Sequence, residues 1–326
     1  MRQIKYLELV KENVNALYSY FHASSLRCDK LQSLQHALGE PQIKLKHAID
    51  IRWLAMYDAV VAVHNSYGSL VSTLKDDEES KQMSIKAKLV LKFVTECNFP
   101  AVTALLADVL KIVSNLSKKF QSDSIDLSAV EPSVIVAISQ LKALDECPGV
   151  CLREFFESCV HEGRTVTYKG VALTCPDEQA AEFTSLKESY ITNVVDALSK
   201  RLLNDSTDTL KCFGLIEPLS ECNADQTALY IESLAKKFTF LDASELGKEM
   251  KSVTDLKNGC YKGYSLQAFA KAVLLRHQSD LPQTAKLCEI ALCVPVSTAV
   301  CERGFNLQNW LKSKFRNCLG EKPFRI

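Results

Sequence analysis

The sequence predicts a mainly α-helical protein, and three observations lead to that prediction. Apolar residues recur at spacings of three and four along most of the 326-residue chain, which is the period of a helix with one buried face. Eleven glycines and nine prolines are few for this length, so helix breaks are scarce. A strand pattern occurs once and does not alternate with helices, so we expect no complete parallel or mixed sheet.

The N-terminal half is predicted as a series of amphipathic helices. Apolar spacing predicts helices over 4–21 and 26–38, and Gly39 ends the second one. A longer helix is predicted over 52–74, closed by the acidic run 76–79. Further helices are expected over 80–94, 99–120, 129–145 and 152–160.

One segment has the pattern of a small β-hairpin. β-Branched and aromatic residues occupy 164–168 and 171–174, and Lys169-Gly170 between them is a turn signal. Helices are predicted to resume over 177–203, 224–238 and 266–277.

The composition is that of a folded protein with balanced charge. Thirty-nine Lys and Arg offset 39 Asp and Glu, and 47% of the residues are hydrophobic. This mix excludes a collagen-like or disordered chain, and it argues against a surface that binds polyanions on every side.

The 13 cysteines and the first ten residues bear on the compartment. The cysteine number is odd and no CxxC pair occurs, which would leave an unpaired thiol in a secreted protein. Charges at Arg2, Lys5 and Glu8 leave no apolar signal region. The longest nearly uncharged apolar run, 290–300, is too short to cross a bilayer. We therefore expect an intracellular protein with no membrane partner, whose cysteines are small buried hydrophobic residues.

Residues 284–294 are apolar on almost every side. A helix of this kind is covered either by the core of its own chain or by a partner. Pro295 ends the helix, and Ser297 or Thr298 can cap the next one.

The segment that follows contains ten residues that fit one pattern at fixed spacing: Pro295, Ser297, Thr298, Ala299, Glu302, Arg303, Phe305, Arg316, Asn317 and Leu319. The pattern is Pro-x-Ser-(Ser/Thr)-Ala-x-x-Glu-Arg-x-Phe-Ser, followed by a basic stretch ending in Arg-Asn-x-Leu. It resembles the C-terminal dimerisation region of hAT-family transposases and of host proteins derived from them. Asn306 departs from it, because the family usually has Ser there.

A second match lies at Arg52-Trp53, which is similar to the Arg-Trp-x-Ser that opens the helical insertion domain of the family. The family's tryptophan stacks on a flipped base near the transposon end, and Leu54-Ala55 replaces its usual small polar residue here. The resemblance implies three segments: a helical lead-in over 1–50, a helical insertion domain with one small β-hairpin over 51–268, and a dimerisation region over 269–326 made of the C-terminal helices of an incomplete RNase H-like fold.

The resemblance also bears on catalysis. The family's RNase H-like fold holds two divalent metals with Asp, Asp and Glu, because phosphoryl transfer by two metals needs several converging carboxylates. The family's Glu matches Glu302, but no strand-borne Asp precedes Trp53, and the family's zinc finger and Cys-x-x-His signature have no match. We predict that the chain is not an enzyme, that it needs no cofactor, and that Glu302 is vestigial.

Four other residues have the chemistry of zinc ligands: Cys147, Cys151, Cys159 and His161. Their spacing is unlike that of a known finger, so we predict no metal site.

The function implied by the resemblance is dimerisation, either with a second copy or with related hAT-derived proteins. We expect the contact at Leu287, Ile290, Leu292, Pro295, Phe305 and Leu307. Host proteins of this kind are generally nuclear, so the nucleus is the implied location.

Two alternatives stay open. The first is a nucleic-acid-binding regulator that uses Trp53 and the basic residues Arg303, Lys312, Lys314 and Arg316. This alternative rests on the excess of positive charge in residues 281–326, which contain seven Lys and Arg but three Glu. The second is that the chain is a truncated product of a longer transposase-like protein.

Overall fold

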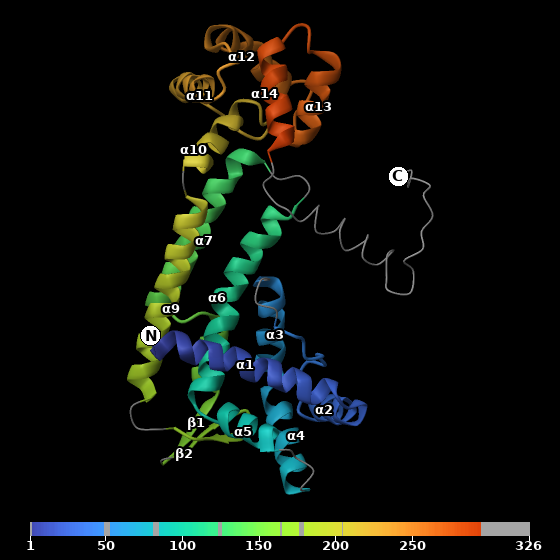
Figure 1. Ribbon diagram of the computed structural model, residues 1–326, viewed down its shortest axis with the longest axis vertical. Helices are drawn as coiled ribbons and strands as arrows, with labels where there is room; N and C mark the ends of the chain where they lie inside the picture. The colour runs from blue at the N-terminus through green and yellow to red at the C-terminus, as the bar shows by residue number, and fades with distance from the viewer. Residues whose placement is uncertain are drawn as a thin grey trace, which may run out of the picture. The chain divides into compact units, whose positions relative to one another are not determined.

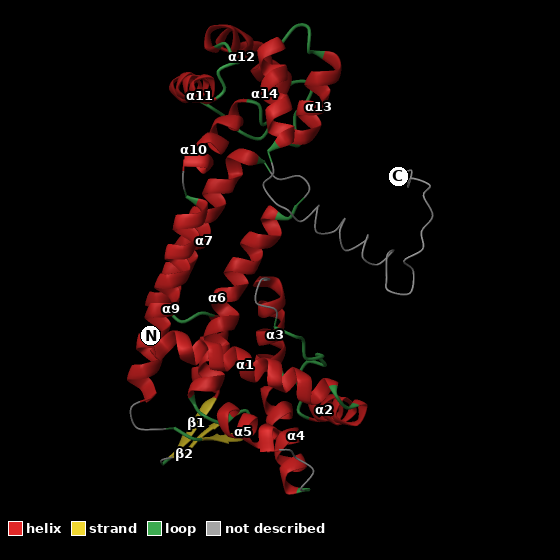
Figure 2. Ribbon diagram, viewed as in Figure 1, coloured by secondary structure: helices red, strands yellow, loops and turns green. Residues whose placement is uncertain are grey.

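The computed structural model describes residues 2–48, 53–80, 85–122, 126–163, 165–175, 179–203 and 205–294. These residues are mainly helical with one small sheet (Figures 1 and 2), so the predicted fold class is confirmed. Packing divides the chain into two compact units, and the predicted boundaries at 50 and 268 remain predictions. Unit 1 is Met1–Ser117 with Val134–Arg201, and unit 2 is Lys118–Ser133 with Leu202–Ile326.

The first two helices of unit 1 follow the predicted apolar spacing. They are α1 (Arg2–His22) and α2 (Ser25–Ala37). Val10, Val14 and Leu17 of α1 are fully or almost fully buried. Ser24 caps α2, because its side chain accepts a hydrogen bond from the backbone N–H of Arg27.

The helix predicted over 52–74 is two helices, because the chain breaks at Ser66. They are α3 (Trp53–Asn65) and α4 (Tyr67–Glu79). The carboxylate of Glu40 accepts hydrogen bonds from the backbone N–H groups of Gly68 (3.0 Å) and Ser69 (3.1 Å). These two groups have no partner inside the new helix, so Glu40 stabilises a helix start that local spacing did not predict.

The acidic run 76–79 lies inside the last turn of α4 instead of beyond it. Negative charge at a helix C-terminus is unfavourable, but Asp77 accepts hydrogen bonds from the Tyr20 hydroxyl (2.7 Å) and the Lys30 ammonium (3.1 Å). Burial alone would raise the pKa of Asp77. These hydrogen bonds and the charges of Lys30 and Arg27 hold that pKa below its usual value.

The chain continues through five more helices and three strands. The helices are α5 (Ile85–Val94), α6 (Asn98–Phe120), α7 (Val130–Glu146), α8 (Val150–Ser158) and α9 (Gln179–Leu202). The strands are β1 (Cys159–Glu162), β2 (Thr165–Tyr168) and β3 (Val171–Leu173), drawn in yellow in Figure 2.

The sheet is antiparallel in the order β1-β2-β3. The predicted hairpin is therefore confirmed, with Lys169 and Gly170 at positive φ in its turn. β1 corrects the predicted helix end at 160. Gly163 has a φ of 61°, and this conformation turns the chain so that β1 pairs with β2.

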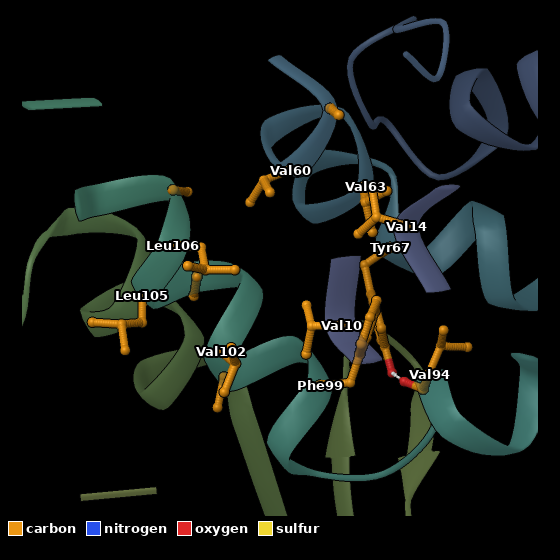
Figure 3. Close-up of a cluster of buried hydrophobic side chains, with 14 of the residues drawn as sticks. Val10, Val14, Val60, Val63, Tyr67, Val94, Phe99, Val102, Leu105 and Leu106 are labelled. Atoms are coloured by element: carbon orange, nitrogen blue, oxygen red, sulfur yellow. Dashed lines mark hydrogen bonds between the residues drawn. The ribbon is translucent and has the colours of Figure 1, made fainter. Parts of the chain in front are cut away.

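The core of unit 1 is built around α6, of which fifteen of 23 residues are buried. Side chains of α1, α3 and α4 gather near Phe99 and Val102 of this helix (Figure 3). The hydroxyl of Tyr67 donates a hydrogen bond to the backbone oxygen of Val94 (2.8 Å), drawn as a dashed line in Figure 3. The apolar residues of α6 therefore form part of the core of unit 1.

Two described stretches are long and apolar enough to cross a membrane, Asn98–Phe120 and Leu127–Ser158. The first is α6, which is largely buried in unit 1. The second is not one helix, since α7 ends at Glu146 and α8 begins at Val150. The absence of a membrane partner stays a prediction.

The cysteines depart from the predicted set of small buried thiols. Cys97 and Cys175 form a disulfide, which joins residues 78 apart in sequence and was not predicted. Three free cysteines of the described chain are exposed: Cys147, Cys260 and Cys293. Cys212 and Cys288 are buried as expected.

Unit 2 is a group of shorter helices. They are η1 (Leu127–Ala129), α10 (Asp205–Lys211), η2 (Cys212–Leu215), α11 (Ala224–Lys237), α12 (Ala243–Asn258), α13 (Leu266–Arg276) and α14 (Pro282–Cys293). Asn223 and Gln226 form a capping box at the start of α11. α12 was not predicted, because its inward apolar residues Leu246, Met250, Val253 and Leu256 are set in a mostly polar sequence.

Candidate dimerisation region

α13 and α14 pack against each other at the end of the described chain, in orange and red in Figure 1. Ser265 starts α13 by accepting a hydrogen bond from the backbone N–H of Ala268 (3.3 Å). Pro282 occupies the first turn of α14, where a missing N–H leaves no helical bond unmade. The Tyr261 hydroxyl and His277 Nε2 are 3.0 Å apart, which ties the chain entering α13 to the chain leaving it.

The start of α14 is capped by Glu249 of α12. The Glu249 carboxylate accepts hydrogen bonds from the backbone N–H groups of Gln283 (2.9 Å) and Thr284 (2.7 Å), and from the Thr284 hydroxyl (2.6 Å). Lys286 also donates to the backbone oxygen of Phe240 (3.2 Å). A negative charge at this end is favourable for the helix dipole, so Glu249 both orients and stabilises α14.

α14 has a buried face and an exposed face. Leu287 and Cys288 have no exposed area, and Ala285 and Ala291 have almost none. Burial raises the pKa of the Cys288 thiol to about 12, with a smaller contribution from the charge of Glu289. Leu292 is 37% exposed. The helix predicted to be apolar on almost every side is therefore covered on one side by its own unit.

A buried lysine fixes the turn next to η2. The Lys257 ammonium donates hydrogen bonds to the backbone oxygens of Gly214 (3.2 Å), Leu215 (3.2 Å) and Ser220 (2.9 Å). Burial lowers the pKa of Lys257, while nearby acidic groups partly offset this effect. One side chain thus donates hydrogen bonds to three backbone carbonyl groups that folding removes from contact with water.

Two carboxylates hold the segment around η1 to the rest of unit 2. Glu217 is buried and accepts hydrogen bonds from the backbone N–H of Ser128 (2.8 Å) and from the Ser128 hydroxyl. Burial raises the pKa of Glu217, although the bonds from Ser128 oppose that shift. Asp126 accepts a hydrogen bond from the backbone N–H of Leu266 (3.3 Å), so this segment also supports the start of α13.

The helical pair has a match among known protein families. Residues 267–322 match the family model of the hAT family C-terminal dimerisation region. The chain contains a hAT dimerisation region. The resemblance inferred from Pro295 to Leu319 is confirmed, and it relates the chain to the hAT transposases. The hAT dimerisation region includes all of α14 and nearly all of α13, and it supports self-association.

The predicted dimerisation residues fall into three groups. Leu287 lies inside the core of unit 2 with no exposed area, so it cannot meet a partner while the unit is folded. Ile290 is half-buried, and Leu292 is exposed. The other three lie outside the described residues: Pro295, Phe305 and Leu307.

The side chains predicted for nucleic-acid binding and catalysis lie outside the described part of the structure. Trp53 is the first residue of α3, but its side chain lies outside the described part. The others also fall outside the described residues: Glu302, Arg303, Lys312, Lys314 and Arg316.

The four residues considered as zinc ligands lie around α8 and β1. Within the described ranges, no three His, Cys, Asp or Glu side chains are grouped to hold a metal. Asp108 instead caps α8 by accepting hydrogen bonds from the backbone N–H groups of Cys151 and Leu152, both 3.0 Å. Burial and the Asp108 charge raise the pKa of the Cys151 thiol to about 12, which disfavours the thiolate that binds metals.

Glu249 is the residue of this region that sequence reasoning missed. Helix caps are recognised from residues within about three positions of the helix start, whereas Glu249 lies 34 and 35 positions from the N–H groups that it binds. Pro282, in the first turn of α14, is the residue next to the helix start that favours its position.

Proposed function

We propose that the chain is a catalytically inactive hAT-related protein that functions by self-association through its hAT dimerisation region. The family match over 267–322 is the observation that carries this proposal. α14 supports it, because one face of the helix is occupied by unit 2 and Leu292 lies exposed. A second copy can contact that exposed side without opening the core.

The oligomeric state tests this proposal. Light scattering across micromolar concentrations should give the mass of a dimer for the full chain. Leu292→Asp should weaken the dimer about tenfold or more, because a charge in an apolar contact loses its water. Leu229→Asp is the matched control, since Leu229 is 63% exposed on α11 of the same unit and outside the matched region. A monomer mass at every concentration would refute the proposal.

The second part of the proposal is the lack of catalysis. One family carboxylate, Glu302, has a match in the chain, and a pair of metal ions needs several carboxylates. We expect no cleavage or strand transfer when the purified chain meets DNA with Mg²⁺ or Mn²⁺. Metal-dependent cleavage that Glu302→Gln abolishes would overturn this part and leave the dimer proposal standing.

Nucleic-acid binding is the second candidate function. The observation that favours it is the excess of seven Lys and Arg over three Glu in residues 281–326. A gel shift on hairpin or single-stranded DNA tests it. Binding that falls steeply with salt and is lost in the triple variant K312Q/K314Q/R316Q would favour this function, because phosphate contacts release counterions. Trp53→Ala then tests for base stacking.

We also propose related hAT-derived proteins as further partners and the nucleus as the location, since host proteins of this kind are generally nuclear. A fluorescent fusion of the full chain checks the location. Mixing with a hAT-derived relative, followed by light scattering, checks for mixed dimers.

A further inference from the structure

Two distant segments of unit 1 lie side by side next to the small sheet. The backbone N–H of Cys97 donates to the oxygen of Thr174 (3.0 Å), and the N–H of Thr174 donates to the oxygen of Thr95 (2.9 Å). This parallel bridge pairs Glu96 with Thr174. The Cα atoms of Cys97 and Cys175 are 5.2 Å apart, which lies in the ordinary range for a disulfide. Backbone hydrogen bonds therefore hold the two cysteines together independently of their covalent bond.

The two cysteines differ in exposure and support. Cys175 is exposed, whereas Cys97 is half-buried. Cys97 immediately precedes α6, and Phe99 in the first turn of that helix is fully buried. A dissolved reagent therefore reaches the sulfur of Cys175 more readily than the sulfur of Cys97. Cys97 is held beside Cys175 by the buried start of α6.

We propose that Cys97 and Cys175 form a redox pair that gains and loses its disulfide by exchange with a glutathione-type disulfide, with Cys175 reacting first. The pair is a modification site of unit 1, and it does not depend on self-association. It operates without refolding, because the bridge between Glu96 and Thr174 is made by backbone groups that exchange leaves intact.

The exchange balances in two steps. The Cys175 thiolate attacks one sulfur of oxidised glutathione, forms a mixed disulfide and displaces one glutathione thiolate. The Cys97 thiolate then attacks the Cys175 sulfur and displaces the second glutathione thiolate. Two electrons pass from the cysteine pair to oxidised glutathione, and the two protons leave with two molecules of reduced glutathione. Excess reduced glutathione reverses both steps.

Other cysteines of the described chain provide an internal comparison. Burial raises the pKa values of Cys151 and Cys288 to about 12, so their thiols stay protonated and react slowly. Cys147, Cys260 and Cys293 are exposed and free. Exchange at these three sites is expected to stop at the mixed disulfide, because none is bonded to a second cysteine in the described part of the chain.

The first experiment uses the unaltered full chain. It is equilibrated in buffers of graded reduced to oxidised glutathione, the free thiols are blocked, and peptides are mapped by mass spectrometry. We expect the Cys97–Cys175 peptide pair to appear under oxidising conditions and to disappear under reducing ones, with helix content by circular dichroism unchanged. Free thiols at both positions under fully oxidising conditions, or loss of helix content on reduction, would overturn the proposal.

The second experiment tests the order of reaction. In Cys97→Ser the mixed disulfide should accumulate at Cys175, whereas in Cys175→Ser the adduct at Cys97 should form about tenfold more slowly, because Cys97 is less accessible. Cys260→Ser is the control and should leave the Cys97–Cys175 bond unaffected. Equal rates at the two positions, or faster reaction at Cys97, would contradict the assigned order.

Discussion

Unit 1 and unit 2 differ in what their cores contain. In unit 1, fifteen of the 23 residues of α6 are buried, and twelve of these are apolar. In unit 2, α12 buries four of 16 residues, and one of the four is Lys257. Short helices leave many backbone groups unpaired at their ends for little apolar area. Unit 1 also buries charged side chains, Asp77 and Asp108, just as unit 2 buries Glu217 and Lys257. The difference between the two units is therefore the larger apolar core around α6.

The two units start some of their helices in the same way. Carboxylates that are distant in sequence cap helix starts in both: Glu40 at α4, Asp108 at α8 and Glu249 at α14. What differs is the support around them, because the caps of unit 1 lie beside a large apolar core. We therefore expect the stability of unit 1 to fall most when a buried side chain is made smaller. The stability of unit 2 should fall most when a buried charged group is removed.

The largest effect is expected from lost volume in unit 1. Phe99→Ala should lower the free energy of unfolding by about 4 kcal/mol, because Phe99 is fully buried and its ring packs on Phe93. Urea unfolding gives the size, and hydrogen exchange shows whether α6 loses protection. Phe156→Ala, at a residue that is 50% exposed on α8, is the control and should cost far less. Equal losses would contradict the stated role of burial.

A loss of about 3 kcal/mol is expected for Lys257→Met in unit 2, because three backbone oxygens lose their buried donor. Hydrogen exchange should increase in η2 and α12 while α6 stays protected. The control is Lys251→Met, an exposed position on the same helix. If Lys257→Met is neutral, the comparison between the two units fails, since apolar packing would then suffice in both.

A pH effect of about 2 kcal/mol at pH 5 is expected from His64 in unit 1. Burial, and then the charge of Lys169, lower the pKa of His64 from 6.5 to about 4 in the folded protein. Between these values the unfolded chain binds a proton that the folded chain does not. Stability is therefore full above pH 6.5 and falls as the pH drops toward 4.

Urea unfolding at pH 7 and pH 5 measures this difference. His64→Gln should reduce the loss between the two pH values, whereas His161→Gln, at an exposed position of β1, should leave it unchanged. An unchanged pH dependence in His64→Gln would show that other groups cause it.

The smallest effect, about 1.5 kcal/mol, is expected for Glu249→Gln, which weakens the cap on α14. Hydrogen exchange should increase at the first turn of α14, and the dimer should weaken if that helix forms the contact. Glu245→Gln is the control, because Glu245 is exposed on the same helix and its side chain pairs with Lys248. Unchanged hydrogen exchange at α14 would show that the Glu249 cap does not stabilise the dimerisation region.

The sequence by itself determined the helical class, the hairpin at Lys169-Gly170 and the hAT dimerisation region, because each follows from local spacing or a local motif. α12 escaped prediction although Leu246, Met250, Val253 and Leu256 have helical spacing, because the residues around them are mostly polar. The tertiary structure alone decided the break at Ser66, the pairing of Cys97 with Cys175 and the exposure of Leu292 on α14. These features depend on contacts between residues tens of positions apart, and apolar period does not specify which distant groups meet.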